Sequence, residues 1–82
     1  MKTNNTLSPV QITRKIKYLT NKRTKCFERL AEAEAKQNLN PCLINESNVA
    51  IIKADIANIN ITITMLEEQL REIQEMYQNQ PQ

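Results

Sequence analysis

The sequence predicts an all-α fold: an antiparallel two-helix hairpin, coiled-coil-like, able to pair with a second copy as a four-helix bundle. Three observations predict it. The 82 residues contain no glycine and three prolines, although the tight turns of β-sheets usually need glycine. Apolar residues recur at alternating spacings of three and four in both halves of the chain. One proline-containing break separates the two halves.

The first helix is expected over residues 8–39, after a flexible N-terminal tail of residues 1–7. Ser8 suits the N-cap, Pro9 suits the first helical position, and Gln11 lies where the partner of a capping box belongs. Several local rules therefore agree on where this helix begins.

One face of the first helix has the heptad spacing of a seam, the line of positions that packs against a partner helix. Two of its positions are polar, Arg23 and Gln37. An arginine stem can lie over apolar surface while the guanidinium reaches water. The seam consists of Ile12, Ile16, Leu19, Arg23, Cys26, Leu30, Ala33 and Gln37.

The turn is expected over residues 40–45. Pro41 cannot continue a helix, and the residue before a proline avoids the α conformation. Asn45 or Ser47 is a candidate N-cap for the next helix. If Asn45 is the cap, Ile44 and Val49 can pack together as a hydrophobic staple.

The second helix is expected over residues 46–78, followed by a flexible tail of residues 79–82. Its seam runs without interruption over four heptads, which is the strongest signal in the sequence. The seam consists of Val49, Ile52, Ile56, Ile59, Ile63, Leu66, Leu70, Ile73 and Tyr77.

Antiparallel packing of the two seams leaves the register to be chosen. The favoured register places Cys26 beside Ile63 and Arg23 beside Leu66, and a slip of one heptad is the main alternative. In the favoured register the two helices match in length, and the basic first helix lies near the acidic end of the second. Residues 1–29 carry eight basic side chains and one acidic side chain, whereas residues 30–82 carry three basic and eight acidic ones.

Apolar residues outside the seam give the second helix an outer face that the first helix cannot cover. Ile51, Ile61 and Met65 lie there with Asn58 between them. Four residues, Ile51, Asn58, Ile61 and Met65, are therefore the candidate partner-binding residues, and the partner is a second copy or another protein. The alternative is that these are ordinary isolated surface residues, kept solvated by neighbouring Thr and Asn.

Basic residues of the first helix are the second candidate surface. Nucleic acid or an acidic protein could contact Arg14, Lys15, Lys22, Lys25 and Arg29. The favoured alternative is a solvated face that pairs with the second helix, because these charges spread over several faces.

Catalysis, metal binding and cofactor binding are not expected. The chain has no histidine and no glycine-rich phosphate loop, and its paired glutamates lie on an exposed helix end. Cys26 and Cys42 form no CxxC motif and are expected as separate thiols, in the core and in the turn. The expected location is cytoplasmic, with no membrane partner, because no run of 18 consecutive apolar residues and no signal peptide are evident.

These features favour a small non-enzymatic interaction module, such as an adaptor, a chaperone-like protein or an inhibitor, with no small-molecule substrate. The alternative is a nucleic-acid-binding helical dimer that uses the basic first helix. The outline is shared by small secretion chaperones, phage-encoded inhibitors and RNA-binding four-helix dimers, and no motif selects among them. Abundant Asn, Ile and Lys are compatible with an AT-rich phage or mobile-element gene.

Overall fold

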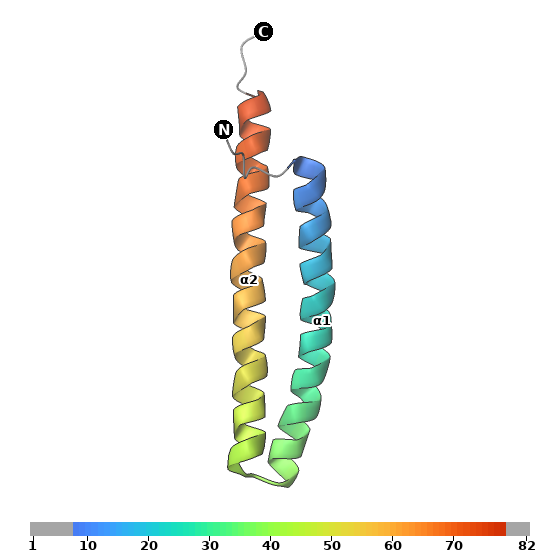
Figure 1. Ribbon diagram of the computed structural model, residues 1–82, viewed down its shortest axis with the longest axis vertical. Coiled ribbons are helices and arrows are strands. Elements are labelled where there is room, and N and C mark those ends of the chain that lie inside the picture. Colours follow the sequence, from blue (N-terminus) through green and yellow to red (C-terminus); the bar gives the residue numbers. More distant parts are fainter. Residues whose placement is uncertain (1–7, 79–82) are drawn as a thin grey trace, which may run out of the picture.

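The computed structural model describes residues 8–78, which form two long helices packed side by side. Helix α1 spans Pro9–Leu39 and helix α2 spans Leu43–Gln78. The helices run antiparallel, and the C-terminal end of α2 projects beyond the start of α1 (Figure 1). The predicted all-α helical hairpin is confirmed.

The start of α1 is held by a capping box. The Gln11 backbone N–H donates to Ser8 Oγ at 3.2 Å, and the Ser8 backbone N–H donates to Gln11 Oε1 at 2.9 Å. Pro9 follows the cap, where its missing N–H removes no helical hydrogen bond. The local signals at Ser8 therefore gave the correct helix start.

The start of α2 differs from the prediction, because the helix begins at Leu43 rather than at residue 46. Asn45 lies inside the helix, and its side-chain amide donates to the carbonyl oxygens of Asn40 at 2.9 Å and Lys36 at 3.4 Å. Asn45 thus serves the C-terminal end of α1: it satisfies the Asn40 carbonyl, which lies past the last helical hydrogen bond, and adds a second donor to the Lys36 carbonyl, which already accepts from the Asn40 N–H. The predictions of an N-cap at Asn45 or Ser47 were wrong.

The predicted staple beside that N-cap also fails, for the same reason. Ile44 lies inside the first turn of α2 and is 73% exposed, so it does not occupy the position before an N-cap that a staple requires. The connection is correspondingly short, and the backbone N–H of Glu46 already donates to the Cys42 carbonyl oxygen at 2.9 Å.

The core is a single layer between the two predicted seams. Its central cluster joins Cys26 of α1 to four isoleucines of α2, with Ile16, Leu19, Leu30 and Ala33 packed partly buried against it. Tyr77 continues the seam of α2 but is exposed, since α2 extends there past the start of α1. Within residues 8–78 the buried side chains are Ile12, Cys26, Ile52, Ile56, Ile59, Ile63 and Leu66.

The register is the alternative one, shifted by one heptad from the favoured prediction. Arg23 Nη1 donates to Asn60 Oδ1 at 2.7 Å, which places Arg23 level with Ile59 and Asn60 rather than with Leu66. The chain reverses direction around Pro41 and α2 begins at Leu43, so the connection between the helices is shorter than the predicted turn of residues 40–45. The two helices therefore do not match in length, and the last turns of α2 are left unpaired by α1 (Figure 1).

Candidate interaction surfaces

The outer face of α2 carries a second line of residues at heptad spacing, which we call the outer stripe. Ile51 is 60% exposed, Ile61 is 58% exposed and Met65 is 61% exposed. Asn58 is also exposed. The structure therefore exposes all four predicted partner-binding side chains outside the buried seam, with Ile51 at the edge of this face, since it also lines a depression shared with α1. The outer stripe consists of Ile51, Ala54, Asn58, Ile61 and Met65.

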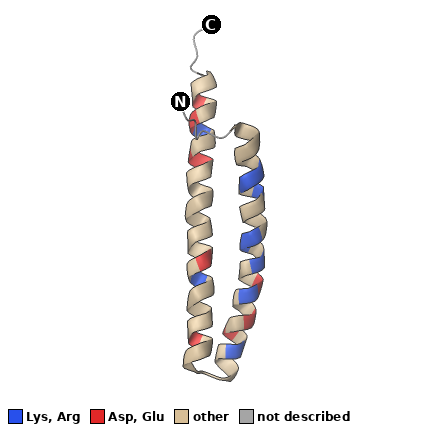
Figure 2. Ribbon diagram, in the orientation of Figure 1, with Lys and Arg blue, Asp and Glu red and all other residues tan. Residues whose placement is uncertain are grey.

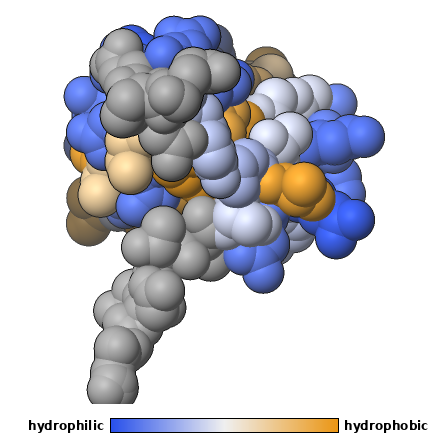
Figure 3. Space-filling model, turned by 90° about the horizontal axis from the view of Figure 1, so that it is seen from above, coloured by the Kyte–Doolittle hydropathy of each residue, from blue (hydrophilic) through white to orange (hydrophobic). Residues whose placement is uncertain are grey.

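Spacing makes the outer stripe resemble the buried seam of the same helix. Its members are three and four residues apart, so they line up along the helix as coiled-coil core positions do. Asn58 is the only polar member, and it lies at the middle of the stripe. Ile44, one heptad before Ile51, extends the apolar line towards the turn. In the view along the helices, hydrophobic side chains reach the rim of the molecule as well as its centre (Figure 3).

Four basic side chains follow one flank of α1 at regular spacing. Lys15, Lys22, Arg29 and Lys36 are seven residues apart, which places them on one line of a helix; we call this line the basic flank. Lys25 lies beside it. Arg14 and Lys17 lie elsewhere on the exposed surface of α1, so the basic residues taken together spread over several faces, as predicted. Figure 2 shows the succession of basic residues along α1.

The expected pairing of these basic residues with the acidic end of α2 was wrong. Among residues 8–78 the ion pairs are Glu34 Oε2 with Lys53 Nζ at 4.0 Å and Glu68 Oε1 with Arg71 Nη2 at 3.7 Å. Neither involves the basic run of α1. The heptad shift contributes to this, since it moves the acidic end of α2 by seven residues towards the start of α1, beyond which α2 projects (Figure 2).

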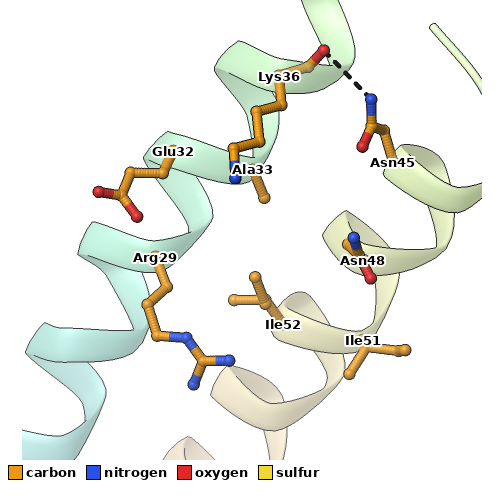
Figure 4. Close-up of a pocket in the computed structure, with 8 residues that line it drawn as sticks. All are labelled: Arg29, Glu32, Ala33, Lys36, Asn45, Asn48, Ile51 and Ile52. Carbon is orange, nitrogen blue, oxygen red and sulfur yellow. Dashed lines mark hydrogen bonds between the residues drawn. The ribbon is translucent and has the colours of Figure 1, made fainter. Parts of the chain in front are cut away.

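A shallow depression of about 320 Å³ lies near the turn, on the side of the basic flank. Arg29 and Lys36 contribute its α1 wall, and Asn45, Asn48 and Ile51 contribute its α2 wall. In Figure 4 the Arg29 guanidinium points across towards α2, whereas the Glu32 carboxylate points away from it. Sequence reasoning missed this depression, because the predicted register did not place Arg29 and Lys36 beside the start of α2.

The two cysteines lie in different surroundings. Cys26 is buried in the core and Cys42 is exposed in the connection, and both are free thiols. Each position agrees with its sequence prediction. Within residues 8–78, no three Cys, Asp or Glu side chains gather as a metal site would require.

By length and composition alone, α2 contains a segment apolar enough to cross a membrane. The sequence interpretation did not anticipate this, because it counted only consecutive apolar residues. Core helices of soluble proteins pass the same test, but they are mostly buried, whereas 28% of this segment is buried within the hairpin. Here α1 packs along α2 and carries Lys and Arg over most of its length (Figure 2), so inserting the hairpin would bring those charges into the lipid at high cost.

Comparison of the chain with protein-family models, with curated proteins and with solved structures finds no match.

Proposed function

We propose that this chain is a small, non-enzymatic protein–protein interaction module that binds through the outer stripe of α2. The carrying observation is that Ile51, Ile61 and Met65 are each about 60% exposed along a single line of heptad spacing. Exposed apolar residues that line up in this way are typical of helix-binding surfaces rather than of isolated surface positions. An adaptor, a chaperone-like protein or an inhibitor, acting in the cytoplasm, fits this proposal.

The small core supports the same proposal. The described chain buries seven side chains in one layer, and a two-helix unit of this size gains little stability from one layer. Covering one exposed Ile or Met fully contributes roughly 1.5–3 kcal/mol, so three side chains contribute several kcal/mol even after allowing for the part already covered. A partner helix on the outer stripe would supply this burial.

A matched pair of methionine substitutions tests the proposal. Met65 is in the outer stripe and is 61% exposed, whereas Met76 is near the end of the same helix and is 71% exposed. We expect Met65→Glu to abolish association with the partner, whether a second copy or a host protein, because a carboxylate would be buried in an apolar contact. Met76→Glu is expected to leave association intact.

The measurements are mass in solution by light scattering and affinity capture from host extract, with helicity by circular dichroism as the folding control. A native chain that associates with nothing would overturn the proposal. So would an association that Met65→Glu and Met76→Glu affect equally.

The basic flank favours a second candidate function, nucleic-acid binding. Lys15, Lys22 and Arg29 project from one line of α1 with no ion pair among the described residues, and Tyr18 is 62% exposed. Cations in such a row can contact phosphates, and the affinity then falls steeply as salt rises.

Gel shifts at low and moderate salt, with duplex and single-stranded probes, test this candidate. Lys22→Gln with Arg29→Gln is expected to weaken a genuine complex. Arg71→Gln, on α2 and away from the basic flank, is the matched control. Absence of binding at low salt removes the candidate.

A further inference from the structure

We infer that the occupant of the outer stripe is a second copy of this chain, packed with its α2 antiparallel to the first and related by a two-fold axis. This inference rests on the proposed function and names its partner. In the resulting four-helix assembly, the two α2 helices lie in the middle and each α1 lies outside.

Apolar self-complementarity supports this arrangement. In antiparallel coiled coils, residues of the two seam lines meet each other across the interface. Pairing the outer stripes in this way brings Ile51 of each copy against Ile61 of the other, and Ala54 against Asn58. Ile51 and Ile61 then cover each other twice, as an isologous two-fold contact requires, and Met65 of each copy faces Ser47 of the other at the edge of the contact. The small Ala54 leaves room for the amide of Asn58.

Charge decides the direction of pairing. Glu68 and Glu72 continue the lines of Ile61 and Met65 by one heptad, and both are exposed. A parallel pair would place these carboxylates against the same carboxylates of the second copy, which is unfavourable. The antiparallel pair separates the two acidic ends and brings the apolar middle of each stripe together.

Asn58 gives the pairing a preferred register. In the proposed pairing its amide lies beside the small Ala54, whereas a shift of one heptad in one direction would set the amide against the bulky Ile61. Within residues 8–78 the contact made by Asn58 is a backbone one, in which its carbonyl oxygen accepts from Thr62 Oγ1 at 3.0 Å. Its side chain thus remains available to the second copy. Asn60, in contrast, is occupied by Arg23.

Cross-linking tests the direction and register together. In a Cys42→Ser background, one chain carries Ile51→Cys and a second chain, with a tag of different size, carries Ile61→Cys. Mild oxidation of the mixture is expected to give the mixed disulfide as the main covalent dimer, with little of either homodimer. Cys26 is buried inside the hairpin, so it is not expected to form a disulfide with a second copy.

The native Cys42 supplies the control for the opposite direction. It is exposed in the turn, so parallel copies would bring the two Cys42 thiols close together. Antiparallel copies keep them about 40 Å apart, from about 28 residues at a rise of 1.5 Å each. Oxidation of the native chain is therefore expected to give no Cys42 disulfide dimer beyond the level found with unfolded chain.

Three results would overturn the inference: a native chain that is monomeric at high micromolar concentration, a homodimeric disulfide from Ile61→Cys alone, or ready Cys42 cross-linking of the native chain. The failure of the proposed function is a separate outcome. A monomeric chain that binds another protein through Met65 overturns the second copy as occupant and leaves the proposed function in place.

Discussion

The two faces of α2 share a heptad spacing of apolar residues but lie in opposite environments. On the inner face, Ile59 and Ile63 are 8% and 5% exposed, whereas Ile61 between them on the outer face is 58% exposed. Helix propensity and hydropathy are equal for these three isoleucines. The difference comes from α1, which covers one side of α2. Whether an isoleucine of α2 is buried thus depends on whether α1 covers its position. The outer face has heptad spacing like the seam, but α1 does not cover it.

The largest expected effect is the difference in stability loss between an alanine substitution on the inner face of α2 and one on its outer face. Ile63→Ala opens a cavity in the core, and we expect it to lower the free energy of unfolding by about 2–5 kcal/mol at every protein concentration. Ile61→Ala is expected to cost measurable stability only at concentrations where the outer stripe is covered. Urea denaturation at high and low protein concentration measures both. Equal losses from the two variants in dilute solution would contradict the comparison.

Gln37, a polar residue of the α1 seam, is expected to give a smaller effect on stability, and one of opposite sign. Gln37 Oε1 is buried and has no hydrogen-bond partner in the described part of the chain. Replacing the amide with an apolar side chain removes the cost of burying it, so we expect Gln37→Leu to raise the free energy of unfolding by about 1 kcal/mol. Gln69→Leu, at an exposed position of α2, is the matched control and should change stability little. A destabilised Gln37→Leu would show that the amide is satisfied in solution.

The polar contact that defines the register is expected to have a comparable or slightly smaller effect. A double-mutant cycle of Arg23→Ala and Asn60→Ala should give a coupling free energy of about 0.5–1.5 kcal/mol, because their 2.7 Å hydrogen bond joins the two helices. The cycle of Arg23→Ala with Asn58→Ala is the control, and it should give no coupling within the hairpin. Thermal or urea unfolding of the four variants provides the values. Coupling to Asn58 in place of Asn60 would mean that α2 is rotated from the orientation described here.

The smallest effect is expected for the ion pair that links the helices at the surface. Glu34 and Lys53 approach to 4.0 Å, and their side chains are 49% and 62% exposed. Exposed pairs of this kind contribute little, so Lys53→Ala should change the free energy of unfolding by no more than about 0.5 kcal/mol, and less at high salt. A loss above about 1 kcal/mol that persists in 1 M salt would contradict this prediction.

The local features of this fold could be predicted because they depend on neighbouring residues. The capping box of Ser8 and Gln11 joins residues three apart in the chain, and both seams follow from spacings of three and four. The positions of Cys26 in the core and Cys42 in the connection were predicted on the same grounds. Exposure of Ile51, Ile61 and Met65 also followed, because one partner helix covers only one side of another.

Asn45 shows why the turn could not be predicted in the same way. An Asn before an apolar run is typical of an N-cap, yet here its side chain donates to the carbonyl of Asn40, the C-cap residue of the other helix. Both uses fulfil the same need for hydrogen bonds at a helix end. The choice depends on how closely α1 and α2 approach at Pro41, which is a property of the closed hairpin.

The sequence by itself determined two helices, their facing seams and the open outer stripe, since each follows from periodicity within one segment. The tertiary structure decided the register, and with it the Arg23–Asn60 bond, the projecting end of α2 and the depression that brings Arg29 near Ile51. The physical reason is that a heptad repeat looks nearly the same after a shift of seven residues, so seam packing alone separates the two registers only weakly. Closure of the short turn supplies the remaining preference, and it requires both helices to be in place.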